Sequence, residues 1–153
     1  MSDPQDPQAF WRNRLAPSAD DLALMAEDAV AIIPDPLRSH LEGIVFQIAE
    51  FPDDDMVNEL GLESPFDLLG LYQGVSLAER STAVTLDQPD MIFLFRRPIL
   101  DYWVAEGERL DHLVRHVLIH EVGHHFGLSD ADMHALEEAA DRDSASSDEG
   151  ARD

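Results

Sequence analysis

The segment from Glu108 to Phe126 constrains the fold of this chain more than any other part of the sequence. Apolar residues recur along it at intervals of three and four: Leu110, Leu113, Val114, Val117, Leu118 and Val122. This period predicts a long α-helix that buries one side against a core. Gly127 follows directly and is predicted to end the helix, because glycine adopts a positive φ without steric cost.

The last two turns of this helix carry the sequence HEVGH, from His120 to His124. Residues four apart share a helix face, so the two imidazoles can bind a single metal ion. Glu121 lies one position further round the helix and can address water on the metal rather than the metal itself. The reversal after Gly127 could return Asp130 to the ion as a third ligand. Two imidazoles, one carboxylate and one open position are typical of a catalytic zinc site.

Three other histidines of the same helix are interpreted as surface or packing residues. His112 and His116 continue the four-residue series, but neither has a neighbouring glutamate, and they are expected to form a polar stripe on a solvated face. His125 points about 100° away from His124 on a helix, which favours packing or exposure over ligation. The predicted imidazole pair is therefore His120 and His124.

The third ligand has several candidates. Asp130 is preferred because it follows the predicted reversal, with His134 and Glu138 as the alternatives. Asp130 could instead serve only as the N-cap of the last helix, a position that Ser129 could also take. The spacing by itself leaves these possibilities open.

The composition limits the chemistry of the chain. Its 153 residues include no cysteine and no lysine, which excludes disulfides, thiol nucleophiles, cysteine-bound metals and lysine Schiff bases. The 32 acidic and 10 basic residues give a net charge of −22. Such a charge repels phosphate backbones and anionic lipid, so neither nucleic acid nor a membrane is an expected partner. Histidine, aspartate and glutamate remain as metal ligands.

Residues 18–140 are predicted to form the folded domain. Residues 1–17 contain three prolines and no regular period, which predicts a loosely held arm. Residues 141–153 lack large apolar side chains and are predicted to form a disordered acidic tail. The first residues do not resemble a secretory signal, and no apolar stretch is long enough to span a bilayer. A cytoplasmic protein is therefore expected.

The remaining patterns predict an α+β domain. Ser18 is a predicted N-cap for the first helix of the domain, and Pro34 is predicted to end it. A small mixed sheet of about three strands, packed against this first helix and the HEVGH helix, accounts for the order of elements. Strands are expected at 44–49, 69–74 and 91–95, and helices at 18–33, 55–60, 65–68, 98–103, 108–126 and 129–140.

The spacing HExxHxxGxxD, from His120 to Asp130, resembles the Asp-zincin variant of the metzincin motif, in which aspartate replaces the third histidine. Together with the short chain and the segments 68–74, 91–95 and 125–132, it resembles the bacterial mini-zincins, a family of small metallopeptidases. The resemblance extends over about residues 20–138.

This resemblance implies a zincin-like fold and one bound Zn²⁺. It implies that His120, His124 and Asp130 are the zinc ligands and that Glu121 is the catalytic base. It also implies that an extended peptide lies along the edge of the strand at 69–74, a form of β-augmentation.

Two functions are expected from these observations. The first is hydrolysis of peptide bonds in a peptide or protein substrate, by a metal-activated water with Glu121 as general base. The alternative is a catalytically weak or inactive zinc-binding domain that acts as a protein-interaction module. Glu121 favours the first, because metal binding alone does not need it. Tyr72 could donate to the oxyanion or simply pack. A zincin-like ribonuclease is disfavoured, because it would want three histidine ligands and a basic surface.

Overall fold

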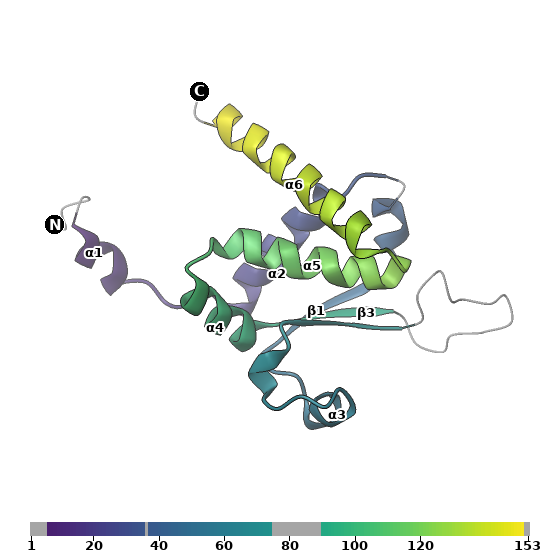
Figure 1. Cartoon of the computed structure of the whole chain (residues 1–153). Helices are drawn as coiled ribbons and strands as arrows, with labels where there is room; N and C mark the ends of the chain where they lie inside the picture. The colour runs from purple at the N-terminus through teal and green to yellow at the C-terminus, as the bar shows by residue number, and fades with distance from the viewer. Residues whose placement is uncertain (1–5, 36, 75–89, 152–153) are drawn as a thin grey trace, which may run out of the picture.

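The structure is a computed structural model that describes residues 6–35, 37–74 and 90–151, with the side chains of the last helix described as far as Arg142. Figure 1 shows the arrangement of the elements. In chain order these are α1 (Pro7–Arg12), α2 (Ala19–Ala31), the 3-10 helix η1 (Arg38–Leu41), β1 (Val45–Ala49), α3 (Asp54–Glu59), the 3-10 helix η2 (Pro65–Asp67), β2 (Gly70–Gln73), β3 (Met91–Phe95), α4 (Arg96–Glu106), α5 (Leu110–Phe126) and α6 (Asp130–Ala151).

The three strands form one mixed sheet in the order β1-β3-β2. β1 runs parallel to β3, with Val45 opposite Met91. β2 runs antiparallel to β3, with Gly70 opposite Leu94. The predicted α+β class and three-stranded mixed sheet are confirmed. β2 is an outer strand of this sheet, and it lies against α5, the helix that carries the HEVGH sequence.

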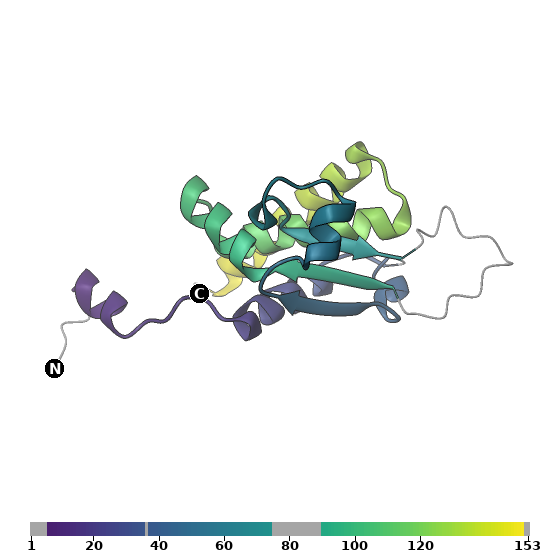
Figure 2. The same ribbon diagram turned by 90° about the horizontal axis from the view of Figure 1, so that it is seen from below.

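β3 is the central strand and is buried on both faces, as its wholly apolar sequence indicates. Ile92 and Leu94 belong to the clusters that pack against α2 and α5. Phe93 and Phe95 belong to a cluster that includes Met56 of α3. Figures 1 and 2 accordingly show α2 and α5 on one side of the sheet and α3 on the other.

Local capping signals explain where α2 begins. The Ser18 hydroxyl accepts a hydrogen bond from the Asp21 backbone N–H, and the Asp21 carboxylate accepts one from the Ser18 N–H. This reciprocal capping box satisfies two backbone donors that the first turn would otherwise leave without partners. Both capping bonds hold the Asp21 pKa below its ordinary value. The predicted N-cap is confirmed.

Glycines with positive φ end two consecutive helices, α4 and α5. Gly107, at φ 68°, closes α4, and Gly127, at φ 69°, closes α5. The left-handed conformation at Gly127 is the one the sequence predicts. Gly107 ends α4, and the chain turns through residues 107–109 before α5 starts at Leu110.

The two ends of the chain contain more helix than the sequence predicts. α1 lies within the predicted arm, capped by Asp6 and with Pro7 in its first turn, but it buries no side chain. The backbone of α6 continues to Ala151 through the predicted disordered tail. Alanine and the charged residues of that segment are compatible with a helix by their intrinsic propensities. Residues 1–5 and 152–153 lie outside the described part of the chain.

None of the helices in the described ranges combines the length and the apolar character that a bilayer span requires. The proposed limits of the folded domain, residues 18–140, stay a prediction.

Candidate functional site

Helix α5 carries the predicted site on the part of its surface that faces away from the core. Leu118 and Val122 are fully buried toward the sheet. The side chains of His120 and His124 keep 41% and 56% of their surface exposed. The helix is therefore anchored by one side and presents imidazoles on another, as the apolar period predicts.

Glu121 is the buried acid of the site, with a side chain only 10% exposed. Its Oε2 atom lies 3.2 Å from Nδ1 of His124. Burial raises the pKa of the Glu121 carboxyl above its ordinary value, because the charged form loses hydration. The His124 ring and a hydrogen bond from the Tyr72 backbone N–H act in the opposite direction. The carboxylate is thus held between β2 and the α5 imidazoles.

Gly70 allows β2 to lie close against α5 at the level of Glu121. A Cβ at this position would lie 2.7 Å from Cγ1 of Val117 and 3.2 Å from Cγ of Glu121. Only a residue without a side chain fits such an approach. The sequence alone offers no period or motif that singles out this glycine.

A cavity of about 400 Å³ opens along this junction. It is lined by residues at the start of β2, by polar and apolar residues of α5 and by Tyr102 of α4. Its walls include Leu69, Gly70, Tyr102, His116, His120 and Glu121. The predicted base and one predicted ligand therefore share a cavity with the start of an outer strand.

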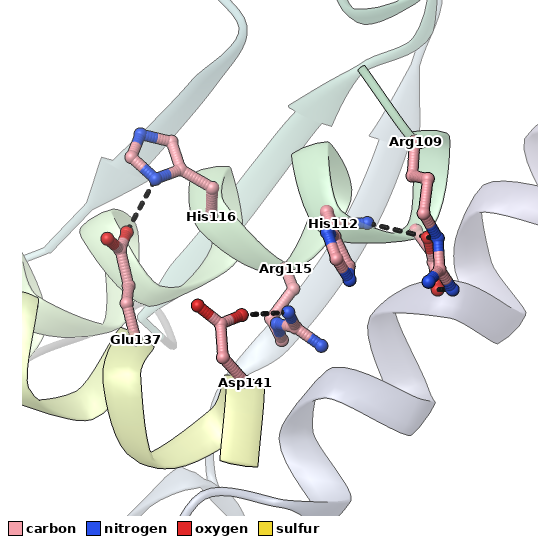
Figure 3. A network of polar contacts seen from close by, with 7 residues as sticks. Arg109, His112, Arg115, His116, Glu137 and Asp141 are labelled. Atoms are coloured by element: carbon pink, nitrogen blue, oxygen red, sulfur yellow. Dashed lines mark hydrogen bonds and ion pairs between the residues drawn. The ribbon is translucent and has the colours of Figure 1, made fainter. Parts of the chain in front are cut away.

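The structure also places His116 beside the site, where the sequence predicts only a solvated stripe. Its Nδ1 atom lies 2.6 Å from Oε1 of Glu137 in α6, and Nε2 of His120 lies 3.6 Å from the same oxygen. The ligand-type atoms of these three residues all lie within 4.8 Å of one another. Figure 3 shows His116 directed from α5 toward Glu137.

The ligand atoms of the three predicted metal ligands do not converge as those of His116, His120 and Glu137 do. Within the described residues, His120, His124 and Asp130 do not form a group with all ligand atoms within 4.8 Å. Asp130 is the exposed first residue of α6, and the Ser129 hydroxyl accepts the Asp132 N–H in the capping position. His134 and Glu138, the alternative third ligands, pair with each other at 3.2 Å and are both largely exposed. The assignment of the ligands stays a prediction.

Glu137 is the residue that sequence reasoning missed. Its signal is the spacing from Met133, which is buried against α5 and only 4% exposed. A residue four positions beyond a buried residue lies on the same face of a helix, so Glu137 must also face α5. The side of α6 that packs against α5 is marked in the sequence only by one methionine in a polar helix, which is a weak signal.

His125 and Tyr72 form a separate buried contact. His125 is 2% exposed, and its Nδ1 atom lies 3.1 Å from the Tyr72 hydroxyl and 3.5 Å from Oδ2 of Asp90. Of the two roles expected for His125, packing or exposure, the structure shows packing. The Tyr72 hydroxyl contacts this histidine, and Tyr72 is not among the residues that line the cavity.

The donor atoms present fit a zinc ion. Zinc at catalytic sites takes three nitrogen or oxygen ligands from the protein and leaves one position open. The α5 histidines with a carboxylate from α6 supply that kind of set, and the buried Oε1 atom of Glu137 faces ring nitrogens of His116 and His120. The site therefore has both the chemistry and an oxygen suited to a cation.

A comparison with curated proteins gives no match. A comparison with protein families matches residues 41–140 to the zincin-like metallopeptidases. The match includes all three strands, α5 and the first half of α6. It supports a peptidase and implies a metal, typically zinc. The chain therefore belongs to the zincin-like metallopeptidase family.

Proposed function

We propose that this protein hydrolyses peptide bonds with a zinc ion held by His120 and His124 and with Glu121 as the general base. Asp130, after the reversal at Gly127, is the third ligand in this proposal. The observation that carries the proposal is the position of Glu121. A buried carboxylate lies next to both histidines of the motif and lines the same cavity as His120.

Bound zinc would supply an acidified water and a polarised scissile carbonyl. Glu121 would accept the proton as the water attacks and then deliver it to the departing amine. Burial raises the pKa of this carboxyl above its ordinary value, which makes the carboxylate a stronger base for accepting that proton. The hydrogen bond from the Tyr72 N–H orients it from the side of β2.

The substrate class follows from the walls of the cavity. An extended peptide can pair with an outer strand through its backbone, which gives affinity without a sequence requirement. Leu69 and Gly70 lie at the start of β2 and line the cavity with Glu121. A peptide aligned there would have its backbone close to the general base. The proposed substrate is therefore an unfolded or extended segment of a peptide or protein.

The test is digestion of a peptide library by the zinc-loaded protein and by its Glu121→Gln variant. The variant keeps size and hydrogen bonding but cannot accept the proton, so turnover should fall at least about 10²-fold. Zinc content is measured in both proteins. Equal cleavage by the two zinc-loaded proteins would refute the role of Glu121. Zinc binding without any cleavage would favour the alternative of a protein-interaction module.

A further inference from the structure

The contact between α5 and α6 contains a group of metal-ligating atoms that the HEVGH motif does not account for. We call the group of His116, His120 and Glu137 the interhelical triad. Two imidazole nitrogens converge on one carboxylate oxygen, at 2.6 Å and 3.6 Å. The two imidazole rings lie side by side, with centroids 4.6 Å apart. Their four-residue spacing on α5 is the same as that of the HEVGH pair.

The carboxylate of the interhelical triad is placed to receive a cation. The side chain of Glu137 is 21% exposed, and its buried Oε1 atom faces the His116 and His120 ring nitrogens, 2.6 Å and 3.6 Å away. A buried carboxylate oxygen is costly unless a charge or a donor compensates it. A divalent ion coordinated by both imidazoles and this oxygen would provide that compensation.

Contacts on either side hold Glu137 against α5. One turn earlier, Met133 packs against Gly123, where the absence of a Cβ leaves room for its thioether. One turn later, Asp141 forms an ion pair with Arg115, whose side chain is only 8% exposed. Figure 3 shows the two charged contacts between the helices next to each other. The triad is therefore built on two packed helices, which positions ligands more rigidly than a loop would.

We propose that the interhelical triad is a second divalent-cation position, for which zinc is the best-suited ion. Two imidazoles and one carboxylate match zinc coordination with an open site. His120 belongs to both this set and the HEVGH pair. An ion bound in the triad therefore prevents His120 from binding a catalytic ion together with His124. If the proposed function holds, the triad is then a regulatory position that excess zinc fills at the expense of catalysis.

Zinc titration of the full chain without His124 tests the site directly. The His124→Ala variant, prepared metal-free, should still bind one Zn²⁺ through the triad. Adding His116→Ala or Glu137→Gln should weaken that binding at least about tenfold, because even indirect ligand partners contribute on that scale. Glu138→Gln is the matched control on the same helix and should leave the affinity unchanged. Co²⁺ provides an independent readout, through the absorption bands of its imidazole complexes.

Two results would overturn the proposed site. One is a His124→Ala protein that is folded by circular dichroism but binds no zinc. The other is zinc binding that is unaffected by His116→Ala and by Glu137→Gln. His116 is more than half exposed, so its replacement should not unfold the chain. Neither result depends on peptidase activity. The zinc titration therefore tests the triad, and the peptide-library digest tests the proposed function independently.

The regulatory consequence has its own measurement. Excess Zn²⁺ should lower peptide cleavage by the wild-type protein. This inhibition is measured as the activity at one equivalent of zinc divided by the activity at ten equivalents. Glu137→Gln should reduce that ratio. The same ratio in both proteins would show that the triad does not compete for His120.

Discussion

The sheet-facing side and the α6-facing side of helix α5 differ in what they contribute. The first is apolar and buried, with Leu118 and Val122 in contact with the cluster around Ile92. The second carries His116 and His120, both substantially exposed, opposite a carboxylate on α6. Burial of the first side stabilises the fold by the hydrophobic effect, and the second side supplies ligands. Stability and chemistry are thus separated by side on one helix, and substitutions on the two sides should have different consequences.

The largest expected effect is on the sheet-facing side. Leu118→Ala should lower the free energy of unfolding by about 2–5 kcal/mol, because it leaves a cavity at a fully buried position. His116→Ala on the other side should change it by less than about 0.5 kcal/mol. Urea unfolding of both metal-free proteins provides the measurement. Similar losses for the two variants would show that the sides are not energetically distinct.

Gly70→Ala tests the place where the sheet-facing side meets the site. The added methyl group would press on Val117 and on Glu121, so destabilisation of about 1–3 kcal/mol is expected. Peptide cleavage should fall as well, because Glu121 is displaced. Gly43→Ala is the matched control, since a Cβ there meets nothing within 4 Å. Full activity in Gly70→Ala would argue against a close functional contact between β2 and α5.

Gly123→Ala probes the α6-facing side. The new Cβ would collide with the Met133 side chain, whose flexible end can partly move. Overpacking of about 1–3 kcal/mol is opposed by a gain of about 1 kcal/mol in helix propensity, which leaves a net loss near 1 kcal/mol. The double variant Gly123→Ala with Met133→Ala should show a favourable coupling energy in thermal unfolding. Additive effects would mean that the two side chains do not compete for the same space.

The smallest effect concerns Glu121, at the border between the two sides. Its pKa is raised in the folded state, so above that pKa, where folded and unfolded chains are both ionised at this residue, the buried charge costs stability. Glu121→Gln should therefore raise the melting temperature of the metal-free protein at neutral pH. The gain should shrink as pH falls through the folded pKa and vanish below the ordinary value of 4.5, where both states are protonated. A gain that persists at acid pH would assign it to packing instead.

Much of the fold could be predicted because its signals are local. The cap at Ser18, the left-handed Gly127 and the apolar β3 each depend on a few neighbouring residues, and all three are confirmed. The helical ends of the chain were not predicted, because α1 and the last part of α6 lack the apolar period that reports burial. A helix without a buried stripe cannot be distinguished from a polar loop by periodicity.

For the candidate site, the sequence could predict the relative positions of the residues that lie on one helix, α5. His120, Glu121 and His124 are related by the helical repeat alone, and Glu121 does lie beside His124. Asp130 depended on the path after Gly127, and there the chain starts α6 at once with Asp130 exposed. Its role as third ligand stays a prediction for zinc titration of Asp130→Ala.

By itself, the sequence determined the zincin-like motif, the α+β class and the side of α5 that is buried, because period and spacing act within one element. Only the tertiary structure decided that Glu137 faces His116 and that Gly70 lies against Glu121. Both contacts join residues of different elements, and packing sets how closely those elements approach. Helix α6 approaches α5 where Met133 lies against Gly123, and β2 approaches α5 where Gly70 has no Cβ. Such distances depend on the volumes of side chains on both partners, which no spacing along a single chain encodes.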